Sequence, residues 1–73
     1  MDENEIRERL LLENGEFKRI HDEHRRYEEL LSSLRSKSRL SDEEKIEESE
    51  LKKRKLALKD RMYKIMADFR KSL

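Results

Sequence analysis

The chain has 73 residues and a formal net charge of +1, because 19 lysine and arginine residues nearly balance 18 aspartate and glutamate residues. Charged residues make up 51% of it and hydrophobic residues 33%, and it has no cysteine, no proline and one glycine. We expect a single domain over residues 1–73, with no disulfide, thiolate metal site or thiol redox centre. An enzyme pocket is also hard to build on so small a core.

The composition predicts an all-α protein. Valine and threonine are absent, whereas Glu, Lys, Arg and Leu dominate, which is typical of long helices and coiled coils. The longest apolar run, Leu10-Leu11-Leu12, is far shorter than the ~20 residues of a membrane span. No apolar segment of a secretory signal follows the acidic start of the chain. We therefore expect a cytoplasmic protein with no membrane segment.

The first expected helix is short, covers about residues 3–13 and ends at a joint near Gly15. Ile6, Leu10 and Leu11 recur in it at helical spacing. Two interpretations of the joint are open. Either Asn14 caps the next helix and Gly15 is its first residue, or Gly15 ends the first helix in a left-handed conformation.

The second expected helix, about residues 15–36, carries the most regular apolar pattern of the chain. Steps of three and four residues separate Phe17, Ile20, His24, Tyr27, Leu31 and Leu34. This spacing is the a/d stripe of a coiled coil. The serine-containing segment that follows, about residues 37–41, is expected to be a loop, because serine side chains compete with helical backbone hydrogen bonds.

The third expected helix, about residues 42–71, begins with a capping box formed by Ser41 and Glu44. Its apolar stripe consists of Leu51, Leu58, Met62, Ile65 and Phe69, interrupted by Lys55. Residues 42–50 carry six acids and one lysine, whereas residues 51–73 carry nine bases and two aspartates. Both halves complement the dipole of the helix.

Two long helices joined by a short polar loop predict an antiparallel, coiled-coil-like hairpin, with the short helix packed against it. Equal rise on either side of the loop places Phe17 opposite Met62 and Tyr27 opposite Leu51. His24 then lies beside Arg54 or Lys55, so the polar interruptions of the two stripes meet. Leu10 and Leu11 fall beside Met66 and Phe69.

Two motifs resemble a known family. The segment Leu51-Lys-Lys-Arg-Lys-Leu-Ala-Leu-Lys-Asp60, with Met62 and Ile65 after it, resembles the YdcH-like family of small bacterial proteins of unknown function. Glu13-Asn14-Gly15-Glu16-Phe17 is similar to the family's Glu-Asn-Pro-x-Phe, and His24, Tyr27 and Leu31 to its His-x-x-Leu-x-x-x-Ile. The resemblance covers roughly residues 10–66, with Gly15 in place of the usual proline. It implies a helical hairpin and a bacterial cytosolic protein, and it transfers no mechanism.

One group of side chains has metal-ligating chemistry. His21, His24 and Glu28 are spaced to lie near one face of a helix, and zinc or nickel accepts such ligands. The sequence offers no evident further ligand, so the simpler interpretation makes His24 a polar residue of the helix seam. No nucleophile with its base and no phosphate-binding glycine loop is evident. We expect no bound metal, no cofactor and no enzymatic activity.

The densest positive charge consists of Lys52, Lys53, Arg54, Lys55, Lys59 and Arg61. A basic segment of this kind can bind phosphate or nucleic acid. Against that function, these side chains point around most of the helix and no aromatic residues alternate with them for base stacking. The simpler interpretation is a solvated helix face with local ion pairs.

Apolar side chains beside the predicted seam form a candidate interaction surface: Leu30, Leu56, Tyr63 and Met66. A hairpin of this size has a marginal core, and pairing two copies into a four-helix bundle would bury more apolar area. We expect a non-enzymatic module for protein–protein interaction or self-association, as a homodimer or with an unidentified protein. The alternative is an anion or nucleic-acid binder that uses residues 52–61.

Overall fold

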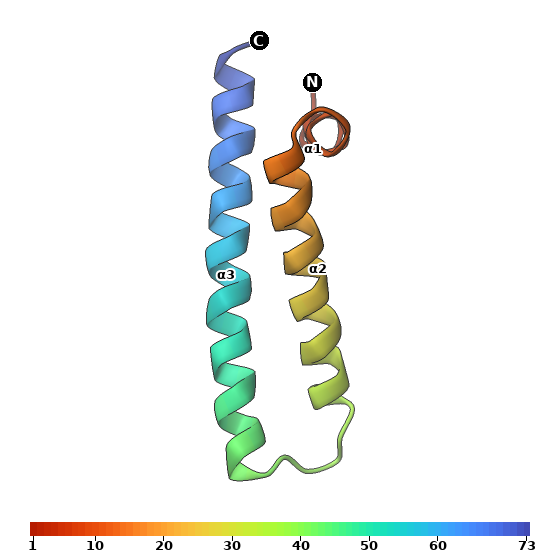
Figure 1. Cartoon of the computed structure of the whole chain (residues 1–73), viewed down its shortest axis with the longest axis vertical. Helices are drawn as coiled ribbons and strands as arrows, with labels where there is room; N and C mark the ends of the chain where they lie inside the picture. Colours follow the sequence, from red (N-terminus) through yellow and green to blue (C-terminus); the bar gives the residue numbers. More distant parts are fainter.

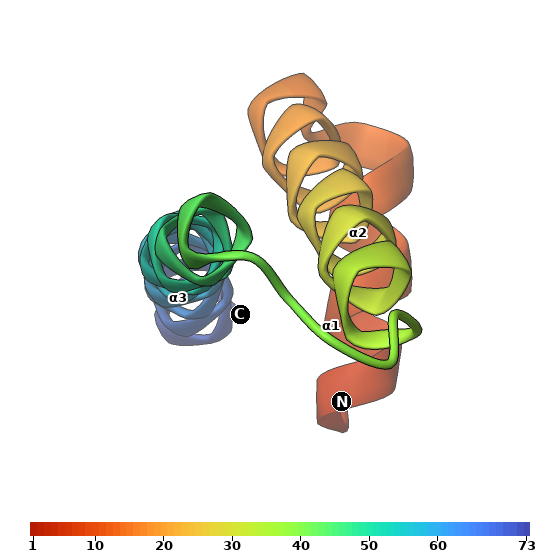
Figure 2. The ribbon, with the colours of Figure 1, turned by 90° about the horizontal axis from the view of Figure 1, so that it is seen from below.

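A computed structural model describes residues 1–73 as three helices with no strands, which confirms the predicted all-α class. These helices are α1 (Glu3–Glu13), α2 (Gly15–Arg35) and α3 (Asp42–Lys71). α2 and α3 lie side by side and run in opposite directions, and α1 lies across the end of this pair (Figure 1). The loop of residues 36–41 crosses between α2 and α3 at the other end (Figure 2). No helix combines the length and the apolar character that crossing a membrane requires.

Asn14 forms the joint between α1 and α2. Its backbone N–H donates to the carbonyl oxygen of Leu10 at 2.8 Å, and its side-chain Oδ1 accepts from the Phe17 N–H at 3.0 Å. The same residue therefore ends one helix and caps the next. Gly15 is the first residue of α2 and does not have a positive φ, so the capping interpretation is confirmed and the left-handed one is wrong.

The start of α3 has the predicted capping box. Ser41 Oγ accepts from the Glu44 N–H at 3.2 Å, and Glu44 Oε1 accepts from the Ser41 N–H at 3.0 Å. The Lys37 ammonium also donates to the Glu44 carboxylate. These hydrogen bonds, that of Lys37 foremost, lower the pKa of Glu44 to about 2. Loop and helix are thus joined by local polar contacts that the sequence encodes within eight residues.

The buried side chains form two clusters along the α2–α3 contact. The larger one contains Ile6, Leu10, Phe17, Ile20, Leu58, Met62 and Met66. The smaller one, near the loop, contains Leu31, Leu34 and Leu51, and the half-buried Tyr27 packs against both. Ile6 and Phe17 are completely buried, each a contribution of roughly 1.5–3 kcal/mol to stability. The docked α1 therefore closes the larger cluster.

The position of α1 corrects one part of the predicted seam. Met66, expected on the flank, is buried with 5% of its surface exposed, whereas Ile65, expected in the seam, is only half-buried. The heptad spacing describes packing against α2 alone. α1 also contacts α3 near its C-terminal end. Because of this second contact, the buried face of α3 there includes Met66 and leaves Ile65 half-buried.

Gly15→Ala is expected to raise the free energy of unfolding by about 0.4–1 kcal/mol in urea titrations. The added Cβ meets no atom within 4 Å, and alanine restricts the unfolded chain more than glycine does. Gly15→Pro should also be tolerated, because proline suits the first position of a helix. A marked loss of stability in both variants would contradict the assignment of Gly15 to the first turn of α2.

Candidate functional site

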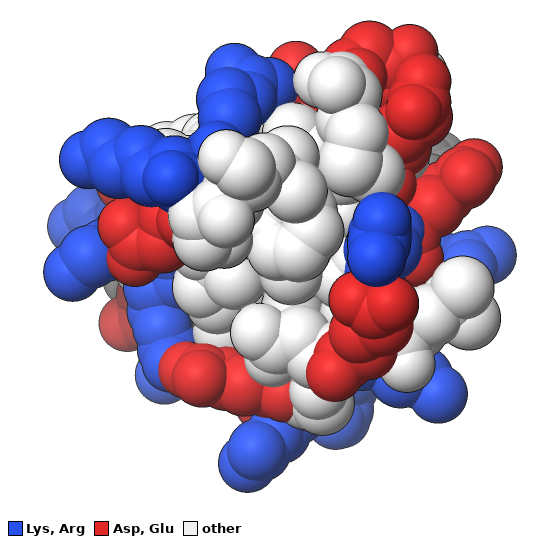
Figure 3. Space-filling model, turned by 90° about the horizontal axis from the view of Figure 1, so that it is seen from above, with Lys and Arg blue, Asp and Glu red and all other residues white.

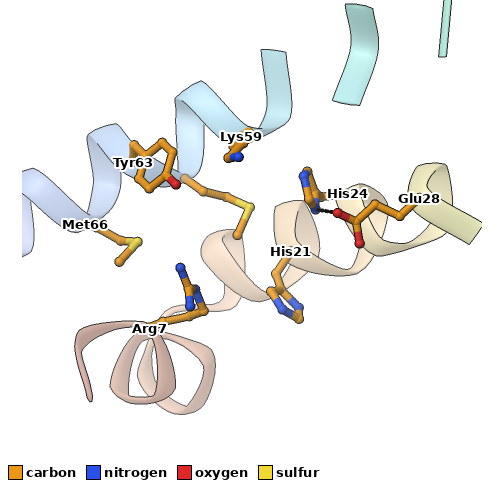
Figure 4. Close-up of a pocket in the computed structure, with 8 residues that line it drawn as sticks. Arg7, His21, His24, Glu28, Lys59, Tyr63 and Met66 are labelled. Carbon is orange, nitrogen blue, oxygen red and sulfur yellow. Dashed lines mark ion pairs between the residues drawn. The ribbon is translucent and has the colours of Figure 1, made fainter. Parts of the chain in front are cut away.

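A cavity of about 310 Å³ opens where the three helices meet, and we call it the histidine groove (Figure 4). Its lining residues are Arg7, His21, His24, Glu28, Lys59, Met62, Tyr63 and Met66. Three- and four-residue steps place His21, His24 and Glu28 on one flank of α2, and Lys59, Tyr63 and Met66 on the facing flank of α3. Arg7 reaches the same cavity from α1 (Figure 4).

His24 lies at the inner wall of the groove, with 16% of its side chain exposed. Its Nδ1 is 3.8 Å from Glu28 Oε1, too far for a hydrogen bond but close enough for electrostatic attraction. Burial lowers the pKa of His24 below its ordinary value of 6.5; the charges of Lys55, Lys59 and His21 add to this, and Glu28 opposes it. The groove therefore favours the neutral imidazole near pH 7.

The prediction that His24 lies beside Arg54 or Lys55 holds for Lys55 and not for Arg54. Lys55 and Lys59 act on the imidazole, whereas Arg54 lines a separate groove on the opposite side of the helix pair with Tyr27 and Leu30. Arg54 and Lys55 are adjacent in sequence, and one step along a helix turns the side chain by about 100°. Only Lys55 can therefore face the histidine side.

The three residues considered as metal ligands do not form a metal centre. His24 pairs with Glu28, but His21 Nδ1 is nearest to Asp22, at 3.6 Å. No group of three or more His, Cys, Asp or Glu side chains is close enough together to hold a metal ion.

The six bases of residues 52–61 are divided among several surroundings. Lys59 faces the histidine groove, with its Nζ 5.8 Å from the centre of the Tyr63 ring. Arg61 pairs with Glu16 at 3.2 Å across the two helices, and Lys52 lies 3.9 Å from Glu48. The segment therefore offers no continuous basic surface on one side of the molecule.

The candidate interaction surface is likewise split. Leu56 and Tyr63 lie on one flank of α3 and are 55% and 46% exposed. Leu30 is exposed beside the opposite groove, with Tyr27 and Leu51, and cannot share one contact surface with them. Met66 is buried and therefore unavailable. The four residues therefore do not form one exposed surface, and only Leu56 and Tyr63 lie together.

Sequence reasoning missed two features at the α1 end of the molecule. Arg7 enters the histidine groove only because α1 docks across the other helices, which no spacing within residues 3–13 indicates. A shallow groove is also lined by Leu10, Asn14, Ile65, Asp68, Phe69 and Ser72. Figure 3, seen from this end, shows uncharged surface bordered by charged side chains. The only signal for this groove in the sequence is the four-residue spacing of Ile65 and Phe69, which the structure shows to be half-buried.

Lowering the pH from about 7.5 to 5.5 should destabilise the protein, in part through His24. The pKa of His24 in the folded state lies below 6.5, so the unfolded state binds the proton first as the pH falls. The contribution of neutral His24 to the free energy of unfolding is therefore complete above pH 6.5. It declines as the pH falls toward the folded-state pKa. His24→Leu should reduce this pH dependence in urea titrations and keep or raise the melting temperature at pH 7.5. A large drop in melting temperature would instead show that His24 makes a structural bond.

Comparison with known proteins identifies one family. The model of a family described as "Protein of unknown function (DUF465)" matches residues 17–66, more than half of the chain. This match confirms the family resemblance found in the motifs. It includes His24, Lys59 and Tyr63 of the histidine groove and lies outside α1. No curated protein and no solved structure matches the chain.

Proposed function

We propose that the chain, which belongs to the DUF465 family of proteins of unknown function, is a non-enzymatic helical hairpin that binds a second copy of itself. The family carries no established activity, so the proposal rests on the surface of this chain. The non-enzymatic part of the proposal is supported by the histidine groove, which no serine of the chain lines. The chain also has no cysteine or threonine that could act as a nucleophile there.

The observation that carries the proposal is the excess of exposed surface. The accessible area is 5802 Å², whereas a compact monomer of 9.0 kDa exposes roughly 4,900 Å² by surface scaling. The radius of gyration is 15.0 Å, against about 11 Å for a compact domain of this length. The difference in area is close to the ~800 Å² that each partner buries in a standard protein interface.

The surface that best suits such an interface is the flank of α3 that carries Leu56 and Tyr63. These side chains are seven residues apart and roughly half exposed, so they face the same direction two turns apart along the helix. Tyrosine is among the residues enriched at protein interfaces and at their energetic hot spots. Leu30 is on the opposite side, so this contact pairs α3 with α3 and does not enclose α2.

The charge distribution of α3 favours an antiparallel arrangement of the two copies. Acids dominate residues 42–50 and bases dominate residues 51–73, so antiparallel pairing about Leu56 brings the acidic first turns of each α3 against the last turns of the other, which include Lys64 and Arg70. Leu56 lies at the middle of Asp42–Lys71. A twofold axis near Leu56 therefore aligns both helices along their whole length. Parallel pairing would instead place like charges together.

Replacing Leu56 and Tyr63 together by glutamate should convert the protein to monomer and remove any rise of the melting temperature with protein concentration. Burying two carboxylates in an apolar contact is costly, whereas both positions tolerate them in a monomer. Sedimentation equilibrium from micromolar to millimolar concentration measures the change.

Leu12→Glu is the matched control, because Leu12 is a leucine of α1 that is 88% exposed; this substitution should leave the association unchanged. If the unmodified protein sediments as a monomer throughout the concentration range, the proposed self-association is wrong. Loss of association in Leu12→Glu as well would move the interface to the α1 end.

A further inference from the structure

We infer that the histidine groove is a binding site for a small phosphate monoester, held by cationic side chains from all three helices. This inference does not depend on the proposed self-association, although Tyr63 borders both surfaces. The site is formed by Arg7 of α1, His24 of α2 and Lys59 of α3, around the apolar floor of Met62 and Met66 (Figure 4).

The cations of the groove are only partly neutralised by the protein. Lys59 forms no ion pair with a carboxylate, and its Nζ lies over the Tyr63 ring. Arg7 shares its guanidinium between Glu3 at 3.1 Å and Asn4 at 3.2 Å, both on its own helix, which leaves further N–H donors free. Glu28 is the only carboxylate that lines the groove, and it lies beside His24 at one end. The lining of the groove therefore carries more positive than negative charge, which favours an anion.

His24 also has a buried nitrogen without a partner. Its Nε2 is inaccessible to solvent and makes no hydrogen bond, as is also true of Nδ1 of His21. Buried polar atoms of this kind are rare, and each costs roughly 1–3 kcal/mol when it remains unsatisfied. Because Nε2 is closed to solvent, the ring must turn toward the groove before a protonated imidazole, with Glu28 on its Nδ1 side, can donate from Nε2 to a phosphate oxygen. The bound anion would thus satisfy an atom that the protein leaves unsatisfied.

Anion binding should be coupled to uptake of a proton by His24. The charged and titratable groups around the imidazole are Arg7 on α1, His21 and Glu28 on α2, and Lys55, Lys59 and Tyr63 on α3. Cations exceed carboxylates in this set, and burial further disfavours the charged ring. A dianion in the groove offsets both effects, so binding should tighten as the pH falls through the range in which His24 titrates.

The size of the groove and its apolar floor favour a phosphate monoester with an organic group rather than inorganic phosphate. Its volume of about 310 Å³ is at the lower end of the ~300–1,000 Å³ of small-molecule sites. The thioethers of Met62 and Met66 and the Tyr63 ring add apolar surface next to the cations. The phosphate would lie among Arg7, His24 and Lys59, and its organic group would pack against these apolar side chains.

The inference is tested by NMR titration of the histidine ring signals with phenyl phosphate, inorganic phosphate and sulfate at constant ionic strength. We expect saturable shifts at His24 with all three anions, and tighter binding of phenyl phosphate than of inorganic phosphate. Equal affinity for both phosphates would overturn the assignment to a monoester. Absence of saturable shifts with every anion would overturn the site itself. Titrations use a protein concentration at which sedimentation shows a single species, because Tyr63 borders both surfaces.

Variants separate the groove from general charge attraction. Lys59→Gln should weaken phenyl phosphate binding about tenfold, as expected for the loss of a charge-assisted hydrogen bond. Lys53→Gln is the matched control, because it removes the same charge from an exposed position of α3 outside the groove. Equal weakening in both variants would show that only net charge matters.

The coupling to protonation is tested with sulfate, whose charge does not change between about pH 5.5 and 7.5, whereas a phosphate monoester titrates in this range. Sulfate binding should tighten as the pH falls, and His24→Gln should remove most of this pH dependence while the variant remains folded. Unchanged pH dependence in His24→Gln would exclude His24 from the site.

Discussion

The docking of α1 across the ends of α2 and α3 is the interaction on which most of this structure depends. Two helices side by side can bury only one stripe each, and the core of such a small chain is marginal. α1 adds Ile6 and Leu10 to the larger cluster and covers Phe17 completely. It also turns Met66 inward and brings Arg7 to the histidine groove. One short helix thus completes the core and one wall of the candidate site.

The exposed surface includes a long face of α3 that neither α1 nor α2 covers. The molecule measures 48 × 20 × 16 Å, so α3 keeps a long face in solvent. That face has a charge gradient and two half-exposed apolar side chains, Leu56 and Tyr63. Between the helices, His24 interrupts the apolar stripe and faces Lys55 and Lys59, so the polar positions of the two stripes meet on the side that opens into the histidine groove.

Much of the local structure could be predicted from sequence, because its causes lie within a few residues. The cap at Asn14, the capping box of Ser41 with Glu44, and the stripe from Phe17 to Leu34 are all set by short spacings. The burial of Met66 and the role of Arg7 could not be predicted, because both depend on the angle at which α1 leaves Asn14. The split between Leu30 and Leu56 had a signal that was overlooked. Each leucine is rotated about its helix axis away from the apolar stripe of that helix, Leu30 in one sense and Leu56 in the other. In an antiparallel helix pair, side chains rotated in opposite senses lie on opposite sides of the pair.

Native-state hydrogen exchange of the α1 amides tests the docking of α1 most directly. An isolated helix of 11 residues is unstable in water, so its amides would exchange almost as fast as those of an unfolded chain. If α1 is docked, the amides of Leu10 and Asn14 should show protection close to that of Phe17 and Lys18 at the start of α2, because all open in the same cooperative unit. Weak protection throughout α1 beside strong protection of α2 would contradict the account.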